Sequence, residues 1–281
     1  MFQKKKENFV LLSDFYIEDH IKNALKEDIG FGDITTENLA AEEDTLTASL
    51  DTREDGILCG RHVFELVFKT LSPEIDVKFY FKDGDKIKKG DKIAEISGSA
   101  KYILMGERVA LNYIQRMSGI ATETSKYQNA IGELPAKIVD TRKTTPNFRA
   151  FEKYAVKTGG GALHRFNLSD CAMIKDNHIK FAGSITKAVS KLRKNISHAH
   201  KIEVECDTLE QVKEALDAGA DIIMLDNMPC DKMKEACKII NKKVIVEASG
   251  NVRLDTVRKI AECGVDIISS SAIVAKAPAL D

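Results

Sequence analysis

Residues 202–226, IEVECDTLEQVKEALDAGADIIMLD, decide the fold. Apolar residues at both ends of this stretch have the spacing of short strands, and those in the middle have the spacing of a helix. Thr208 and Gln211 match a capping box at the start of that helix, and Gly219 fits the position just after its end. A helix between two short strands is typical of a parallel β/α unit.

The same unit recurs through the second half of the chain. Residues 217–223, DAGADII, are echoed by residues 262–268, ECGVDII, and each segment combines a helix end, a glycine and a buried strand. About six units of this kind favour a β/α barrel over an open sheet. Their apolar runs lie at residues 138–139, 172–174, 202–204, 222–225, 244–246 and 265–268.

The first hundred residues have the pattern of a mixed α+β domain. Residues 17–25 show helical spacing, and residues 46–50 alternate as in a strand. Residues 83–98 place turn glycines between short strands, which faintly resembles half of a lipoyl- or biotin-carrier domain. An ordinary hairpin is the better interpretation, because no lysine stands at its tip in a recognisable context. A helix over residues 105–117 is expected to link this part to the second.

The bulk composition excludes several classes of protein. Hydrophobic residues make up 43% and charged residues 30% of the 281 residues, which suits an ordinary globular protein. The formal net charge of −1 gives no bulk electrostatic support for a nucleic-acid partner. The opening residues, MFQKKKE, lead into no apolar stretch of the kind a secretory signal needs. No apolar run approaches the roughly 20 residues that span a bilayer, so we expect no membrane partner.

The cysteines favour a reducing compartment. They are scattered, and no two of them form a Cys-x-x-Cys pair. This pattern predicts reduced thiols in a cytoplasmic protein, and it argues against a disulfide framework or a zinc site. The six are Cys59, Cys171, Cys206, Cys230, Cys237 and Cys263.

Charged residues follow the apolar runs where each expected strand ends. The carboxyl ends of barrel strands meet at one mouth, so residues far apart in sequence are expected to converge there. Arginine forks suit carboxylates and phosphates, and two carboxylates fit Mg²⁺ held between protein and substrate phosphates. The set therefore predicts a small polyanion and a metal-complexed phosphate ester as ligands. Its members are Arg142, Lys143, His164, Arg165, Lys175, Glu205 and Asp226, with Glu205 and Asp226 as direct or indirect Mg²⁺ ligands.

Three segments near these residues are also informative, and two of them allow more than one interpretation. The glycines at 159–161 form either a flexible loop or a backbone that approaches a ligand closely, but no dinucleotide-binding fingerprint. Strand alternation puts Lys201, Glu203 and Glu205 on one side, where they either pair with one another inside the barrel or meet a ligand. Residues 144–146, TTP, predict the start of a helix.

Several segments are together far more specific than any single motif. They are residues 26–36, KEDIGFGDITT; 112–122, NYIQRMSGIAT; 140–146, DTRKTTP; 159–165, GGGALHR; 174–178, IKDNH; and 203–205, EVE. In these segments, and over nearly its whole length, the chain resembles the quinolinate phosphoribosyltransferases, also called carboxylating nicotinate-nucleotide pyrophosphorylases.

The resemblance implies an activity, a fold and an assembly. The family transfers phosphoribose from phosphoribosyl pyrophosphate (PRPP) to the ring nitrogen of quinolinate, giving nicotinate mononucleotide, pyrophosphate and CO₂ in de novo NAD biosynthesis. Its α/β fold implies an N-terminal sandwich domain over residues 1–118, to which residues 273–281 return, and an open parallel barrel over residues 119–272. A homodimer or hexamer is implied, in which a neighbouring subunit completes each active site.

The resemblance also carries roles onto matching positions. It makes Arg142, His164, Arg165 and Lys175 the cradle for quinolinate, with Arg108 entering from the neighbouring subunit. It assigns the pyrophosphate and Mg²⁺ to Lys143, Glu205 and Asp226, which with Lys175 are the expected catalytic residues. Further substrate-binding positions, mainly for the 5′-phosphate, are Thr141, Ser249, Gly250, Asn251, Ser270, Ser271 and Ala272. The chain departs from the family at residues 269–276, SSSAIVAK, where the family shows a glycine and a Thr-His pair.

Two other interpretations compete with this one. A paralogous class associated with molybdenum transport operons shares the fold, but it is expected to lack the KDNH sequence that stands here at residues 175–178. A catalytically silent scaffold is the alternative from another class. Such a scaffold has no need of charged residues at the ends of so many strands.

Overall fold

The computed structural model describes residues 12–281, so the expectation for residues 1–7 lies outside the described range. The chain divides into two compact units. The first contains the described residues up to Thr122 together with residues 150–159 and 278–281, and the second contains residues 123–149 and 160–277. The domains expected from the sequence differ in that they leave residues 150–159 out of the first unit and begin the C-terminal return at residue 273.

The helix at residues 150–159 shows why this difference arises. Phe151 is fully buried, and its ring lies 5.3 Å from that of Tyr113 and 4.8 Å from that of His20, both in the first unit. An amphipathic pattern reveals that one face of a helix is buried but not what covers it. Local sequence therefore gives no signal that this helix belongs to the first unit.

The first unit is built on a three-stranded antiparallel sheet in the order β1-β5-β3. Helix α3 packs Val63, Phe64, Val67 and Phe68 into the core, a stripe at helical spacing. The elements are α1 (Asp14–Ile29), α2 (Ile34–Leu39), β1 (Thr45–Asp51), β2 (Gly56–Ile57), α3 (Arg61–Leu71), β3 (Asp76–Phe79), β4 (Lys86–Ile87), β5 (Lys92–Ser99) and α4 (Ala100–Ile131). Helix α4 is much longer than the expected 105–117 and runs on into the second unit.

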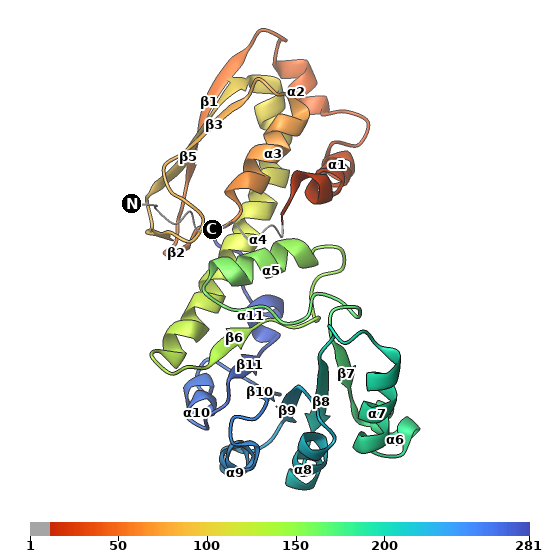
Figure 1. The fold of residues 1–281 in the computed structure, drawn as a ribbon. Coiled ribbons are helices and arrows are strands. Elements are labelled where there is room, and N and C mark those ends of the chain that lie inside the picture. Colours follow the sequence, from red (N-terminus) through yellow and green to blue (C-terminus); the bar gives the residue numbers. More distant parts are fainter. Residues whose placement is uncertain (1–11) are drawn as a thin grey trace, which may run out of the picture. The chain divides into compact units, whose positions relative to one another are not determined.

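The second unit contains a six-stranded parallel sheet in the order β6-β11-β10-β9-β8-β7. Figure 1 shows α7, α8, α9 and α10 along one side of it. The strands are β6 (Lys137–Val139), β7 (Ala172–Ile174), β8 (Ile202–Cys206), β9 (Ile222–Asp226), β10 (Ile245–Ser249) and β11 (Ile267–Ser269). The helices of this unit are α6 (Asp176–Ala182), α7 (Ile185–Asn195), α8 (Leu209–Asp217), α9 (Cys230–Ile240), α10 (Val257–Ala261) and α11 (Ala272–Ala275). Helix α5 (Arg149–Thr158) belongs to the first unit from residue 150 onward. The predicted fold class is confirmed, and each of the six apolar runs forms a strand.

Local signals were accurate at one helix and wrong at another. The capping box of Thr208 and Gln211 is present at the start of α8, and Gly219 follows its end with a φ of +81°. The helix start expected at residues 144–146 is wrong, because α5 begins only at Arg149. Asn147 takes a left-handed conformation with a φ of +62°, which no helix accommodates.

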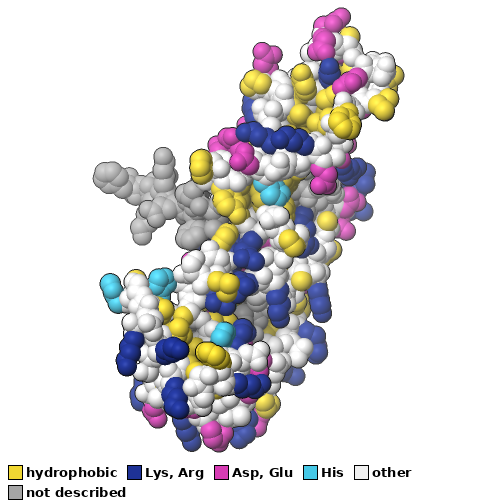
Figure 2. Space-filling view, turned by 90° about the vertical axis from the view of Figure 1, so that its right-hand side faces the viewer, with side chains coloured by type: hydrophobic (Ala, Val, Ile, Leu, Met, Phe, Trp, Pro, Cys, Tyr) yellow, Lys and Arg dark blue, Asp and Glu magenta, His cyan; other side chains and the backbone are white. Residues whose placement is uncertain are grey.

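The distribution of surface charge and the length of the helices are relevant to the expectation that the protein binds neither nucleic acid nor a membrane. In Figure 2, Lys and Arg side chains are dispersed over much of the visible surface and interspersed with Asp and Glu, in keeping with the small net charge. No helix among residues 12–281 is long and apolar enough to cross a membrane.

Candidate active site

A cavity of about 770 Å³ lies at the carboxyl ends of the strands in the second unit. Fourteen of the site residues expected from the sequence line it, and they come from the carboxyl ends of all six strands and from the loop before β7. These are Thr141, Arg142, Lys143, His164, Arg165, Lys175, Glu205, Asp226, Ser249, Gly250, Asn251, Ser270, Ser271 and Ala272. The predicted convergence of these positions on one mouth is therefore a feature of the structure.

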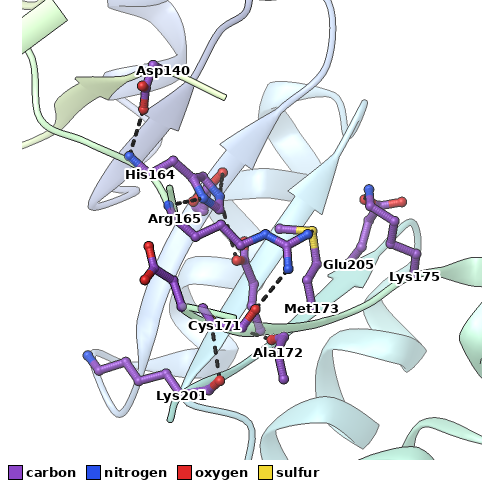
Figure 3. Close-up of polar contacts among 12 residues, drawn as sticks. Asp140, His164, Arg165, Cys171, Ala172, Met173, Lys175, Lys201 and Glu205 are labelled. Atoms are coloured by element: carbon purple, nitrogen blue, oxygen red, sulfur yellow. Dashed lines mark hydrogen bonds and ion pairs between the residues drawn. The ribbon is translucent and has the colours of Figure 1, made fainter. Parts of the chain in front are cut away.

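Cations gather on the β6 and β7 side of this cavity. Arg165 is held by a hydrogen bond from Nη1 to the carbonyl oxygen of Cys171 at 2.8 Å, and its Nη2 lies 3.5 Å from the sulfur of Met173 (Figure 3). Arg142 follows β6 and is exposed. Desolvation, with the charges of Arg165 and Arg149, lowers the pKa of Arg142 from its ordinary value. Mutual repulsion of this kind favours a bound polyanion.

His164 connects the cavity to a buried acidic pair. Its backbone N–H donates to Asp140 Oδ1 at 2.8 Å, and its Nε2 lies 3.6 Å from Glu203 and 3.4 Å from Glu247. Burial lowers the pKa of His164, but the hydrogen bonds and charges of the two glutamates outweigh burial and raise this pKa to about 10. Glu203 and Glu247 are themselves 1% and 2% exposed.

One contact of His164 favours the neutral ring instead. The backbone N–H of Arg165 donates to its Nδ1 at 2.7 Å, which requires that nitrogen to be unprotonated. Two buried glutamates lie within 4 Å of Nε2 and favour a proton on the ring. Burial, with the charge of Glu247, also raises the pKa of Glu203, so the proton is held by the group of three side chains. We therefore treat His164 as a cation that the two glutamates hold in place.

The alternatives for the charged residues of β8 are now resolved. Glu203 pairs with His164 and not with Lys201, whose side chain is exposed and which precedes the strand, at the end away from the mouth. Glu205 lies at the mouth, where its Oε2 is 2.5 Å from Nζ of Lys175 (Figure 3). Lys175 is the N-cap of α6, and its backbone N–H donates to Nδ1 of His178 at 3.0 Å. The Lys-Asp-Asn-His sequence thus places the lysine at the end of a strand.

The β10 and β11 side of the cavity has small residues and unusual backbone conformations. Asn227, Gly250 and Asn251 have positive φ values of 51°, 95° and 48°. The side-chain amide of Asn251 donates to Asn227 Oδ1 at 2.9 Å. A Cβ at position 250 would collide with the side chain and the backbone nitrogen of Asn227, so only glycine fits. Successive N–H groups in such conformations form concave anion sites.

The glycines at 159–161 have a structural role. Gly160 adopts a φ of +91°, and the turn it makes brings Ala162 beside β6, where the Ala162 N–H donates to the carbonyl oxygen of Ile138 at 2.8 Å. None of these three glycines is among the described residues that line the cavity, and the first lining residue after the turn is His164. The alternative of a glycine backbone against the ligand is therefore not supported.

Glu205 and Asp226 fit the expected Mg²⁺ site by their chemistry. Both are carboxylates at the ends of adjacent strands and both line the cavity, which supplies the hard oxygen donors that Mg²⁺ prefers. A second group of His and carboxylate atoms, all within 4.8 Å of one another, is formed by His164, Glu203 and Glu247. The ion pairs described above account for that group.

Some residues of the cavity were not among the predicted site residues. They are Met173, Met224, Asn227, Val252, Arg253, Ser269 and Lys276. Most of them flank predicted positions at strand ends, which is the signal that would have found them. Arg108 is the one predicted residue outside the cavity; it is an exposed residue of α4 in the first unit, where it borders a recess with Arg53 and Glu107.

Comparisons with known proteins give a consistent result. Models of the N-terminal and C-terminal domains of quinolinate phosphoribosyl transferase match residues 33–118 and 120–281. The probable nicotinate-nucleotide pyrophosphorylase (carboxylating) of Synechocystis sp. is 43% identical over 94% of this chain and 90% of its own length. A quinolinate phosphoribosyltransferase (decarboxylating) of Nicotiana tabacum is 40% identical, with 94% of this chain and 80% of its own length covered. A crystal structure of NadC from Streptococcus pyogenes has a TM-score of 0.94 at 42% identity and covers 96% of this chain and 95% of its own.

Proposed function

The chain belongs to the quinolinate phosphoribosyltransferase family, and we propose that it transfers phosphoribose from PRPP to quinolinate in de novo NAD biosynthesis. Quinolinate loses a carboxylate as CO₂ in the reaction, and the products are nicotinate mononucleotide and pyrophosphate. The observation that carries the proposal is the convergence of seven basic side chains, two carboxylates and a positive-φ backbone segment on one cavity.

The cation cluster suits the two carboxylates of quinolinate. Arg142 and Arg165 present planar forks that match carboxylates, and Lys175 and His164 add charge on either side of them. Lys175 is paired with Glu205 in the structure, so quinolinate would compete with Glu205 for this ammonium group. A cradle built for two carboxylates should reject nicotinate, because the cations meant for the missing carboxylate would stay unpaired.

The remaining lining residues suit PRPP. Lys143, Glu205 and Asp226 would handle the pyrophosphate, and Thr141 is a further contact next to them. The positive-φ segment at Ser249–Asn251 and the hydroxyls at Ser270 and Ser271, beside Ala272, suit the 5′-phosphate. Glu205 and Asp226 would hold Mg²⁺, directly or through water. When bound, this ion neutralises charge on the pyrophosphate as it leaves.

The proposed chemistry assigns the protein a positioning role. The ring nitrogen of quinolinate bonds to C1 of the ribose as the bond to pyrophosphate breaks, and Lys143 stabilises the charge that develops on the leaving oxygen. The ring nitrogen is then positively charged and stabilises the electron pair that stays on the adjacent ring carbon when its carboxylate leaves as CO₂. The carbon that lost CO₂ takes up one proton. Arg142, Arg165 and Lys175 keep the ring aligned through both steps.

The decisive experiment measures pyrophosphate release with quinolinate, PRPP and Mg²⁺, with nicotinate in place of quinolinate as the control. Release that depends on quinolinate, with formation of nicotinate mononucleotide, is the expected result. Equal turnover of nicotinate, or none of quinolinate, would contradict the proposal. The molybdenum-associated paralogue and the silent scaffold both predict no turnover of quinolinate.

We further propose a homodimer or hexamer in the cytoplasm, in which Arg108 enters the cavity of a neighbouring subunit. Arg108 is exposed and available for such a contact, and all six cysteines are free thiols, as a reducing compartment favours. Mixing two inactive variants, Arg108→Ala and Lys175→Ala, should restore part of the activity, because a mixed pair contains one intact site. No recovery in verified mixed oligomers would rule out the sharing of sites.

A further inference from the structure

Arg149 lies beside the cavity without lining it, and each part of its guanidinium has a partner. Its Nε donates to Oγ1 of Thr144 at 3.0 Å, its Nη1 donates to the carbonyl oxygen of Phe166 at 3.0 Å, and its Nη2 contacts the carbonyl oxygen of Arg142 at 3.4 Å. The side chain is half-buried. These three acceptors lie on two separate loops.

The two loops carry most of the cation cluster. The loop after β6 holds Arg142 and Lys143 and runs on to Thr144, and the loop before β7 holds His164 and Arg165 and runs on to Phe166. A shallow recess between them is lined by Arg142 and Arg149 on one side and by residues 167–169 on the other. Arg149 therefore connects the two loops at the base of the groups that would bind quinolinate.

We propose that Arg149 is a positioning residue that sets the spacing between the Arg142 fork and the Arg165 fork. The inference rests on the proposed function, since it assigns those two forks to the carboxylates of one quinolinate molecule. Another bond joins these loops, from the backbone N–H of His164 to Asp140 Oδ1 at 2.8 Å. Arg149 adds three more, two of them to the backbone carbonyls of Arg142 and Phe166 next to the two forks.

Only a guanidinium satisfies this arrangement. Its donors point in fixed directions in one plane, which lets one side chain reach acceptors on two loops at once. A lysine keeps the charge but offers a single ammonium group, which cannot match three acceptors in that geometry. Substitution of Arg149 by lysine therefore separates the effect of its charge from the effect of its hydrogen-bond geometry.

The test uses Arg149→Ala and Arg149→Lys with steady-state kinetics for both substrates. We expect kcat/KM for quinolinate to fall by about tenfold or more in both variants, because small misplacements of a binding group cost this much. The KM for PRPP should stay within about twofold of the wild-type value. Added guanidinium or methylguanidinium should restore part of the activity of Arg149→Ala, whereas methylammonium should not.

Arg258→Ala is the matched control. Arg258 also donates to a backbone carbonyl, that of Ala130, and pairs with Glu262, but it lies on α10 outside the cavity lining. This variant should have wild-type kinetics for both substrates. Thermal unfolding of each variant shows whether a loss of activity comes from a loss of folded protein, and Arg149→Lys serves if Arg149→Ala does not fold.

Three outcomes would overturn the positioning role in an active wild-type enzyme. They are wild-type kinetics in Arg149→Lys, an equal loss of kcat/KM for both substrates, and recovery of Arg149→Ala by methylammonium as well as by guanidinium. If the wild-type enzyme itself releases no pyrophosphate with quinolinate, the proposed function has failed instead. Wild-type activity thus separates the two failures.

Discussion

On the β6 and β7 side the cavity is lined mainly by long charged side chains, whereas on the β10 and β11 side small residues and a shaped backbone predominate, with Arg253 and Lys276 as the long exceptions. The first side has Arg142, Lys143 and Arg165, and desolvation, followed by the charges of Arg165 and Arg149, lowers the pKa of Arg142. The second side has Gly250 and Asn251 in left-handed conformations. Its N–H groups attract an anion without bringing formal charges together.

The difference determines what a substitution does on each side. On the charged side, the loss of one cation leaves carboxylates of the ligand unpaired, which is expensive in a partly buried site. On the backbone side, the loss of one hydroxyl removes little, but a change of backbone shape removes several N–H contacts at once. Substrate-specific kinetics can test this division, since quinolinate and PRPP report on different sides.

The largest effect is expected for Lys175→Ala. The variant removes a cation from the quinolinate cradle and leaves Glu205 unpaired where a dianion must bind, so kcat/KM for quinolinate should fall on the order of 10²-fold or more. Lys180→Ala is the matched control, because Lys180 is also paired with a carboxylate, Asp176 at 3.0 Å, but lies outside the cavity lining. Wild-type pyrophosphate release by Lys175→Ala would remove this residue from the cradle.

Gly250→Ala should impair PRPP binding on the backbone side of the cavity and leave quinolinate binding on the charged side unchanged. The new methyl group would collide with Asn227, and alanine resists a φ of +95°, so the KM for PRPP should rise by about tenfold. Gly219→Ala is the control: its φ of +81° imposes similar strain, but a Cβ there meets open space. If both variants lose the same amount of thermal stability and neither changes the KM for PRPP, Gly250 has no part in phosphate binding.

Glu247→Gln should make quinolinate binding sensitive to pH. In the wild-type protein Glu203 and Glu247 raise the pKa of His164 to about 10, so the favourable charge is present below its ordinary pKa of 6.5 and is lost only as the pH rises through about 10. Removing one carboxylate lowers this pKa, and the cation is then lost at a lower pH. We expect kcat/KM for quinolinate to fall several-fold between about pH 7 and pH 9 in the variant but not in the wild type. Identical profiles would show that His164 is not held as a cation.

The charged side of the cavity was easy to predict, and the reason is chemical. Arg142, Lys175 and Glu205 each follow an apolar run, and the rule that strand ends of parallel sheets converge was enough to bring them together. The family resemblance supplied their roles. The partner of Glu203 was harder, because His164 is 39 positions earlier in the chain (203 − 164) and only the fold brings it close.

Features that depend on backbone conformation could largely not be predicted from the sequence. The backbone shape at Asn227 and Asn251 depends on left-handed conformations. Asparagine adopts these more readily than most residues, but an asparagine in a sequence does not by itself predict one. The same conformation at Asn147 explains why the helix expected to start at residues 144–146 does not start there. Contacts between distant segments, such as Arg149 with Phe166, depend on loop geometry that no spacing rule describes.

The smallest effect is expected where the chain departs from its family. Lys276 lines the cavity beside Ser269, Ser270 and Ser271, in the stretch where the sequence led us to expect a departure from the family pattern. It is exposed, so its attraction for a phosphate is weakened by solvent and should be worth under about 1 kcal/mol. We expect Lys276→Ala to raise the KM for PRPP by about two- to fivefold, with an effect that fades at high salt and with an unchanged KM for quinolinate. Lys259→Ala, on α10 away from the cavity, controls for the general loss of surface charge. If the affinity for quinolinate falls instead, Lys276 acts with the charged side of the cavity, and the proposed division into a quinolinate side and a PRPP side is wrong.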